Sequence, residues 1–344
     1  MGGHKAIASV QSTVQLHNPH ASNRTGLNQE DIAMHSHEAP AKKLISMSTL
    51  GRNGRFGNQV FQYAFLRIYA EKYGLNLQTP DWIGQVLFGH SEPEPAVAHK
   101  QVKEAEHDFL GSLREPMADA PHDIDLWGYF LFHTSHYRPY KSLFTSLFRP
   151  VPDIKTELEN SLGKLRREYG TLIGMHLRRG DFGYGNYFIP PNKWYKKWLS
   201  ELWERELNPV LFIASDEPVK VIRDFRKYNP VTAEDIGAHM ERAEFYPDFF
   251  ILSQCDALAI SNSTFSFSAA MLNGSGRLFA RPNCIEKRLT SFDPWNSDPL
   301  LECSNPDIAL RVGQKIEILK GRLFNRMSKL EAGLTQRWNT KHTV

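Results

Sequence analysis

Hydrophobic residues along the chain form short apolar runs that alternate with longer helical patterns. The first run covers residues 44–48, and a glycine-containing loop joins it to a helical pattern over residues 59–73. One face of this expected helix carries Val60, Tyr63, Ala64, Arg67 and Ile68. Residues 126–132 predict another buried strand, whereas the prolines and charges of residues 91–106 are typical of a surface loop. A strand, a glycine loop and a helix form the opening unit of an α/β domain.

A second series of strands and helices begins after the prolines at positions 150 and 152, which indicate a domain boundary. A helix is expected at residues 154–169. Strands are then expected at residues 171–177, 209–214, 257–261 and 277–280, and helices at residues 191–207, 245–255 and 263–272. This alternation favours a parallel doubly wound sheet. We therefore predict one α/β domain over residues 41–150 and a second over residues 151–305.

The two ends of the chain lack this alternation. Residues 1–40 have no sustained periodicity and predict a disordered tail. Residues 306–344 predict a basic helix that either packs on the domains with a solvated face or contacts an anionic membrane surface. No run reaches the ~18 apolar residues of a membrane-spanning helix, and no signal-peptide core is visible. We expect a soluble cytoplasmic protein, with contact at the inner membrane surface as the open alternative.

Composition narrows the class of protein further. The chain has 344 residues, of which 41% are hydrophobic and 23% charged, as is ordinary for a globular protein. A net charge of +3 and the absence of nucleic-acid-binding signatures predict no nucleic-acid partner. Cys255, Cys284 and Cys303 are odd in number and lack metal-ligand spacing, which favours scattered buried thiols of a reducing compartment.

The strongest chemical signal is the stretch GMHLRRGD, which ends at Asp181. In an extended backbone, His176 and Arg178 project to one side and Arg179 to the other. Ligands of open α/β sheets bind beyond the carboxyl ends of strands, so Arg178 can present its fork of donors to a phosphate. The alternative is a surface cluster in which Arg179 pairs with Asp181.

Two other strand ends carry candidate binding residues. Residues 260–270 change from a strand to small hydroxyl residues that open a helix, and the free N–H groups of such a start favour an anion. Capping by Asn262 or Ser263 is the structural alternative. Asp216 follows the strand at residues 209–214 and could accept hydrogen bonds from a ribose or a guanine, or simply cap a helix.

The glycine loop at residues 51–57 is a weaker signal. It matches neither the G-x-G-x-x-G pattern nor a phosphate-binding G-x-x-x-x-G-K-[ST] loop. Its glycines allow close backbone approach, and Asn58 lies at the start of the following helix, facing the expected cleft.

These segments together resemble the inverting α1,2-fucosyltransferases. The stretch GRFGNQVFQYA from Gly54 is similar to their opening motif, and HLRRGD from His176 resembles their His-x-Arg-Arg-Gly-Asp motif. Residues 128–130 and 248–270 are also similar, so the resemblance covers roughly residues 44–300. It implies a GT-B-like fold, in which two Rossmann-like domains face a cleft. It also implies an enzyme that moves L-fucose from GDP-β-L-fucose to a galactoside hydroxyl with inversion, forming an α1,2 linkage.

The resemblance implies roles for individual residues. Arg178 matches the arginine that binds the β-phosphate in the wider superfamily, and His176 and Asp216 match residues that hold guanine or ribose. Ser263 and Thr264 match phosphate contacts. The expected GDP-fucose contacts are Gly57, Asn58, His176, Arg178, Arg179, Asp216, Ser263, Thr264 and Phe265, and the expected catalytic residues are Arg178, Asn58 and Asp181.

The general base is the main departure from related enzymes. Asn58 matches an asparagine near the reacting sugar in protein O-fucosyltransferases. The acidic base of α1,6-fucosyltransferases would fall near Asn186, and no carboxylate lies between Asp181 and Glu201. Asp181 is the remaining candidate, and its alternative role is a structural partner of Arg179.

No metal or other cofactor is expected, because Arg178 and the helix start can stabilise a leaving diphosphate alone. Asp123 and Asp125 have the spacing of a metal-binding pair but precede an expected strand and predict a turn. The expected partners are GDP-fucose and a galactose-terminated glycan, whose binding loops should lie in residues 80–145. The rival hypotheses are a fucosyltransferase of another linkage, a protein O-fucosyltransferase and a catalytically inactive GDP-sugar-binding protein.

Overall fold

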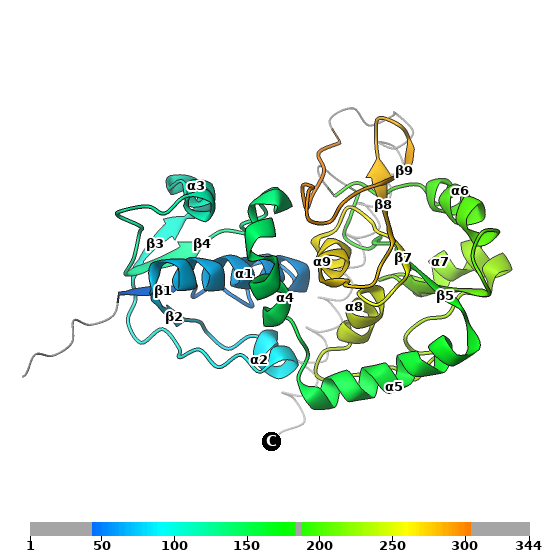
Figure 1. The fold of residues 1–344 in the computed structure, drawn as a ribbon, viewed down its shortest axis with the longest axis horizontal. Coiled ribbons are helices and arrows are strands. Elements are labelled where there is room, and N and C mark those ends of the chain that lie inside the picture. Colours follow the sequence, from blue (N-terminus) through cyan, green and yellow to red (C-terminus); the bar gives the residue numbers. More distant parts are fainter. Residues whose placement is uncertain (1–42, 184–186, 304–344) are drawn as a thin grey trace, which may run out of the picture. The chain divides into compact units, whose positions relative to one another are not determined.

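The computed structural model describes residues 43–183 and 187–303, and the expected tail and basic C-terminal helix lie outside these ranges. The described residues belong to one compact unit. Its described part contains two β-sheets, each with its own helices (Figure 1). This α/β architecture agrees with the predicted fold class, while the domain boundaries near residues 150 and 305 stay predictions.

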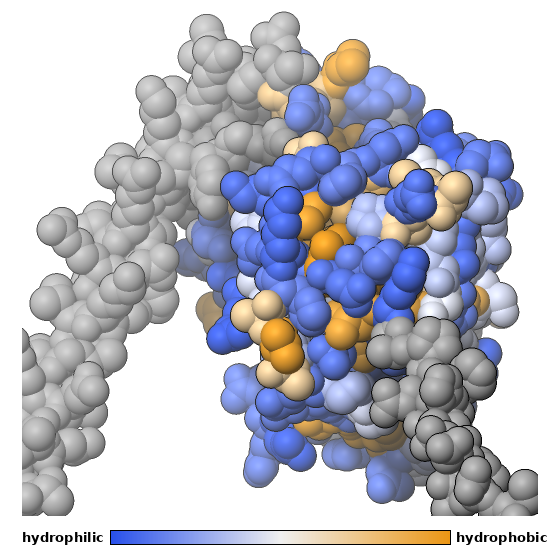
Figure 2. All heavy atoms as spheres, turned by 90° about the vertical axis from the view of Figure 1, so that its left-hand side faces the viewer, coloured by the Kyte–Doolittle hydropathy of each residue, from blue (hydrophilic) through white to orange (hydrophobic). Residues whose placement is uncertain are grey.

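The first sheet has four parallel strands in the order β2-β1-β4-β3. Its strands are β1 (Leu44–Ser46), β2 (Asn76–Gln78), β3 (Lys100–Lys103) and β4 (Ile124–Trp127). The helices of this half are α1 (Phe56–Tyr73), α2 (Ile83–Phe88), α3 (Phe109–Arg114) and α4 (Lys141–Leu147), with single 3₁₀ turns η1 (Glu104–Glu106), η2 (Thr134–His136) and η3 (Arg138–Tyr140). Hydrophilic residues cover most of the face of this half that Figure 2 shows, and apolar residues appear between them in small groups.

Helix α1 begins at Phe56, three residues before the predicted start, so Gly57 and Asn58 belong to its first turn. It ends at Gly74, whose left-handed backbone (φ 64°) lets its N–H reach the carbonyl of Glu71. The predicted single apolar face understates its burial, since 13 of its 18 residues are buried. The helix packs against the first sheet and against α4 and α9, so nearly its whole circumference is covered.

The second sheet has five strands in the order β6-β5-β7-β8-β9. They are β5 (Thr171–His176), β6 (Pro209–Ala214), β7 (Ala257–Ala259), β8 (Leu278–Asn283) and β9 (Arg288–Ser291). The first four are parallel, as predicted, and β9 adds an antiparallel edge that the sequence did not reveal. The helices of this half are α5 (Pro152–Glu168), α6 (Asn192–Trp203), α7 (Pro218–Phe225), α8 (Tyr246–Leu252) and α9 (Thr264–Leu272), with the 3₁₀ turn η4 (Arg226–Tyr228).

Three expectations for the first half were wrong. The strand expected at residues 126–132 starts at Ile124 and ends at Trp127, and residues 128–130 form a turn. The segment expected to be only a loop, residues 91–106, contains β3, whose sequence KQVK has a single apolar, buried residue and therefore gives no strand pattern. Asp125 lies within β4 rather than in a turn, and its buried carboxylate accepts hydrogen bonds from the Ser46 and Ser48 hydroxyls.

The cysteine interpretation also needs correction. Cys284 and Cys303 form a disulfide, and only Cys255 is a free, buried thiol in the described residues. The 19-residue spacing gave no signal, because the path of the chain around β9 decides whether these Cα atoms come within 6.1 Å. Disulfides are typical of oxidising compartments, so the cysteines no longer support the expected reducing environment.

Candidate active site

A cavity of about 790 Å³ opens at the carboxyl ends of strands from both sheets. The first sheet contributes the segment after β1 and Tyr129, which follows β4. The second contributes residues after β5, β6 and β7, among them Arg178, Asp216 and Ser263. This is the edge at which open α/β sheets bind ligands. A depression of similar volume between α6 and α7 is lined by lysines and arginines, but no strand end reaches it.

Arg178 is the central cation of the cavity. Its guanidinium forms ion pairs with Asp181 (2.5 Å) and Asp216 (3.2 Å) and lies over the ring of Phe182. The side chain is 17% exposed, so it is fixed in place yet open to the cavity. Because a guanidinium carries five N–H donors, these two carboxylates leave donors for a ligand.

His176 lies behind Arg178 on the same side of the chain, as the alternation of an extended backbone predicted. Its Nδ1 is 2.9 Å from the Ser261 hydroxyl. Burial, with a smaller contribution from the charge of Arg179, lowers the pKa of His176 to about 3. The imidazole is therefore neutral near pH 7 and can offer a single ring N–H or lone pair to a ligand.

Arg179 points away from the cavity. Its buried guanidinium donates to the backbone carbonyl of Arg178 and to the side chain of Asn192. Asp181 pairs instead with Arg178 and with Arg55 from the opposite side of the cavity (2.9 Å). The expected pairing of Arg179 with Asp181 was wrong, because the chain leaves the extended conformation and turns at Gly180, where the Phe182 N–H donates to the Arg179 carbonyl at 2.8 Å.

Asp216 supports the turn that carries Arg178. One carboxylate oxygen accepts the backbone N–H of Arg179 at 2.8 Å, and the other faces Arg178. A Cβ at Gly180 would lie 2.4 Å from this second oxygen, so only glycine lets the turn approach so closely. Burial raises the pKa of Asp216, and the nearby Arg178 opposes that rise. Both oxygens of Asp216 are thus already engaged within the protein.

Helices α1 and α9 lie against each other (Figure 1), and residues of the first turn of each line the cavity. A Cβ at Gly57 would lie 2.3 Å from the backbone nitrogen of Phe265, so this glycine is required by helix packing. The Asn58 amide oxygen accepts a hydrogen bond from the Thr264 hydroxyl at 2.8 Å. Ser263 is the N-cap of α9 and accepts from the Phe265 N–H, as the structural alternative predicted.

Tyr129, Phe245 and Asp248 are among the cavity-lining residues that were not predicted as site residues from the sequence. Asp248 lies in the first turn of α8, and burial raises the pKa of its carboxyl to about 7. No hydrogen bond or ion pair joins this carboxylate to another residue of the described ranges. Its position within a similar segment was the only available signal, because nothing in the local sequence shows that the side chain faces a cavity.

Residues 43–183 and 187–303 contain no group of three or more His, Cys, Asp or Glu side chains arranged to hold a metal ion. No helix in the same part of the chain has the length and apolar character needed to cross a membrane.

Comparison with known proteins identifies the family. The sequence model described as "Glycosyl transferase family 11" matches residues 19–290. The chain belongs to glycosyl transferase family 11. It is 23% identical over 254 residues to "Galactoside alpha-(1,2)-fucosyltransferase 1" of Pan troglodytes, covering 67% of this chain and 66% of that protein, slightly under two thirds of its length. The protein of the same name from Homo sapiens is 25% identical over 249 residues, 67% of each chain.

Solved structures resemble this family 11 glycosyltransferase in fold. NodZ α-1,6-fucosyltransferase, co-crystallised with GDP, superposes with a TM-score of 0.52 at 12% identity, covering 73% of this chain and 98% of that one. Another structure, fucosyltransferase NodZ from Bradyrhizobium, gives a TM-score of 0.50 at 12% identity and covers 74% and 99%. The two-sheet GT-B-like arrangement is therefore shared with known fucosyltransferases.

Proposed function

We propose that this family 11 glycosyltransferase moves L-fucose from GDP-β-L-fucose to a galactoside hydroxyl with inversion, forming an α1,2 linkage. The names of the curated relatives support the donor sugar and the linkage. The observation that carries the proposal is the convergence of Arg178 and the start of α9 on one cavity. Both features favour an anion, as the diphosphate of a nucleotide sugar requires.

The donor would lie along the second-sheet side of the cavity. Arg178 and the N–H group of Thr264 would bind the diphosphate, with the neutral His176 beside them, whereas the Ser263 N–H already donates to the Ser261 carbonyl at 2.9 Å. Asp216 was expected to receive guanine or ribose, but its two oxygens are engaged by Arg178 and the backbone. We propose that the unpartnered Asp248 carboxylate receives N–H donors of the guanine instead.

Inversion requires one displacement at the anomeric carbon, through a transition state with oxocarbenium character. Negative charge then grows on the departing GDP, so a guanidinium aimed at the β-phosphate stabilises the transition state more than the ground state. Asp181 is held by Arg55 and Arg178, so stabilisation of the leaving group contributes more to catalysis than proton removal by this carboxylate. Asn58, fixed by Thr264 at the floor of the cavity, would lie beside the transferred sugar.

The deciding experiment incubates the full chain with GDP-fucose and methyl β-galactoside, lactose or N-acetyllactosamine. We expect GDP release that depends on the galactoside, and a product in which fucose is α-linked to O2 of galactose. A product with another linkage would overturn the α1,2 assignment alone. Binding of GDP-fucose without transfer or GDP release would indicate an inactive binding protein.

Metal independence is part of the proposal, because Arg178 and the start of α9 supply the positive charge that Mn²⁺ or Mg²⁺ supplies elsewhere. We expect EDTA to leave the rate of GDP release unchanged. A loss of activity in EDTA that added Mn²⁺ or Mg²⁺ restores would overturn this part.

A further inference from the structure

The turn at residues 128–130, directly after β4, has an unusual backbone. Phe130 has a positive φ of 53°, a region that bulky side chains avoid. Such a conformation is energetically unfavourable and persists only where surrounding contacts impose it. The Phe130 ring is buried and stacks on Phe65 at a centroid distance of 4.1 Å, so packing fixes this residue inside the first half.

The Glu104 carboxylate holds the N–H groups of this turn. One of its oxygens accepts the N–H of Tyr129 and the N–H of Phe130, each at 2.9 Å. A Cβ at Gly128 would lie 2.6 Å from the Glu104 Cβ, so glycine is needed for this close approach. One carboxylate oxygen therefore organises two successive peptide groups.

The carbonyl groups of the same turn are held from the opposite direction. Gln62, fully buried on α1, donates from its amide to the carbonyl of Gly128 at 2.8 Å and to that of Asn53 at 3.1 Å. The Tyr137 hydroxyl donates to the carbonyl of Phe130 at 2.6 Å. Side chains from three separate elements thus satisfy the backbone of a turn that propensity alone would not form.

The side chain that this arrangement delivers to the cavity is Tyr129. Its ring packs on the glycine loop, where a Cβ at Gly54 would lie 2.9 Å from the Tyr129 Cε1. The ring is partly exposed, and its hydroxyl has no hydrogen-bond partner among the described residues. An aromatic ring with a free hydroxyl offers an apolar face and a polar tip to a ligand.

The distribution of charge in the cavity indicates which of the two substrates the Tyr129 ring contacts. Arg178 and the start of α9 come from the second sheet, whereas Tyr129 comes from the first. The first-sheet lining has one cation, Arg55, which is paired with Asp181. An uncharged aromatic surface opposite the anion-binding groups suits a neutral sugar better than a diphosphate.

We propose that Tyr129 contacts the acceptor galactoside, stacking its ring on the apolar face of the hexopyranose and bonding a sugar hydroxyl through its own. Glu104 is a positioning residue that acts through the turn. This inference rests on the proposed function and names the residue that binds its acceptor.

The test measures acceptor and donor kinetics separately, using GDP-fucose and the galactoside of the panel that gives the highest turnover. Tyr129→Ala should raise the acceptor KM roughly tenfold, since one aromatic contact is worth about 1–1.5 kcal/mol. Tyr129→Phe keeps the ring and should raise it about threefold. The donor KM and the hydrolysis of GDP-fucose without acceptor should stay within twofold. Trp127→Ala, an exposed aromatic two residues earlier that does not line the cavity, is the matched control and should change neither KM.

Substitutions of Glu104 test the positioning role. Glu104→Ala leaves both N–H groups unpaired and should raise the acceptor KM in the same direction as Tyr129→Ala. Glu104→Gln retains one oxygen able to accept both N–H groups and should restore the wild-type KM. Failure of the amide to rescue would overturn the hydrogen-bonding role of Glu104.

The outcomes separate this inference from the proposed function. An active wild type whose acceptor KM is unchanged in Tyr129→Ala would overturn the inference alone. A rise in the donor KM, with the acceptor KM unchanged, would assign Tyr129 to the donor and also overturn it. A wild type that transfers fucose to no galactoside would overturn the proposed function and this inference with it.

Discussion

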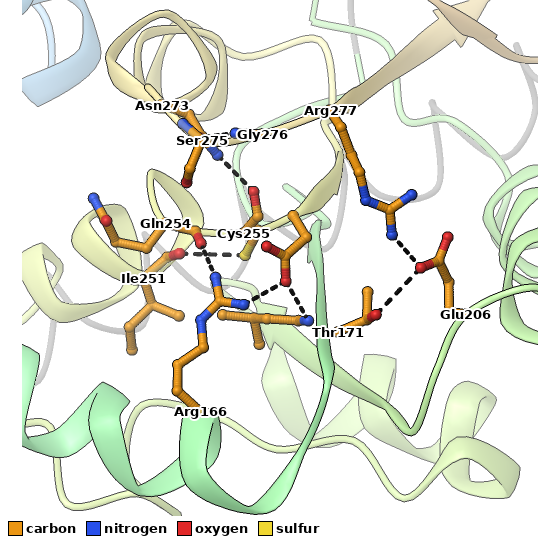
Figure 3. Close-up of polar contacts among 12 residues, drawn as sticks. Arg166, Thr171, Glu206, Ile251, Gln254, Cys255, Asn273, Ser275, Gly276 and Arg277 are labelled. Atoms are coloured by element: carbon orange, nitrogen blue, oxygen red, sulfur yellow. Dashed lines mark hydrogen bonds and ion pairs between the residues drawn. The ribbon is translucent and has the colours of Figure 1, made fainter.

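Both edges of the second sheet carry arginines paired with carboxylates. They differ in whether hydrogen-bonding groups remain available for a ligand. At the amino edge, Arg166 pairs with Asp256 and Arg277 pairs with Glu206 (Figure 3). At the carboxyl edge, Arg178 pairs with two carboxylates beside the cavity. The same residue types therefore occur at both ends of neighbouring strands.

Charged groups at the amino edge form further hydrogen bonds within the protein. Asp256 also accepts the backbone N–H of Leu172 at 2.7 Å, and Arg166 also donates to the carbonyl of Gln254 at 2.5 Å. Glu206 also accepts from the Thr171 hydroxyl, as Figure 3 shows. Three of these four charged side chains, all except Arg277, have a further partner from the backbone or a second side chain, so the network joins strands and helices rather than receiving a ligand.

The carboxyl edge is left incomplete. Arg178 keeps guanidinium donors beyond its two ion pairs, and Asp248 has no partner in the described residues. An incomplete polar site costs stability and is retained where a ligand completes it. The comparison teaches that unsatisfied groups, more than charge itself, distinguish the binding edge from the structural one.

The largest expected effect is the loss of activity when Arg178 at the carboxyl edge is replaced, compared with Arg166 at the amino edge. Arg178→Ala should lower the rate of fucose transfer by about 10²–10³, the usual cost of losing one donor to a developing charge. Because the side chain is partly open to the cavity, the thermal unfolding midpoint should change little. Steady-state GDP release at saturating GDP-fucose and circular dichroism measure the two quantities.

The control for this prediction is Arg166→Ala, the same change at the amino edge. It should keep transfer within threefold of wild type while lowering the free energy of unfolding. Equal losses of activity in folded Arg178→Ala and Arg166→Ala would contradict the proposed difference between the two edges.

The second prediction concerns pH and Asp248. Burial raises its pKa from 3.8 to about 7, so the folded protein binds this proton more tightly than the unfolded chain. The resulting stability is complete below about pH 4 and is lost as the pH rises through 7. Asp248→Asn should therefore increase the free energy of unfolding at pH 8 by about 2 kcal/mol, with the increase vanishing toward pH 4. Urea titrations at several pH values check this, and a pH-independent difference would contradict it.

The smallest expected effect is that of replacing an aspartate by asparagine at the amino edge. Asp256→Asn keeps an oxygen for the Leu172 N–H but removes the charge that faces Arg166. We expect a loss of about 1 kcal/mol in the free energy of unfolding, because the pair is partly exposed, and no change in transfer rate. Stabilisation by this substitution at pH 8, as expected for Asp248→Asn, would show that the two edges do not differ as described.

The local sequence allowed much of this site to be predicted. Strands ending near His176 and Ala214, and a helix opening after Ser263, follow from short apolar runs and small polar residues. Since parallel strands bring their carboxyl ends to one edge, the sequence also placed Arg178 and Asp216 near that helix start. These features depend on interactions between residues close in the chain, which pattern and propensity describe well.

Tertiary structure alone decided which residues face the cavity and which charges are satisfied. The turn that presents Tyr129 exists because Glu104 and Gln62, distant in sequence, hold its backbone. The high pKa of Asp248 and the disulfide between Cys284 and Cys303 likewise depend on the path of the folded chain. Burial and pairing between residues far apart in sequence leave no local pattern, because the same residue types stand equally well on a solvated surface.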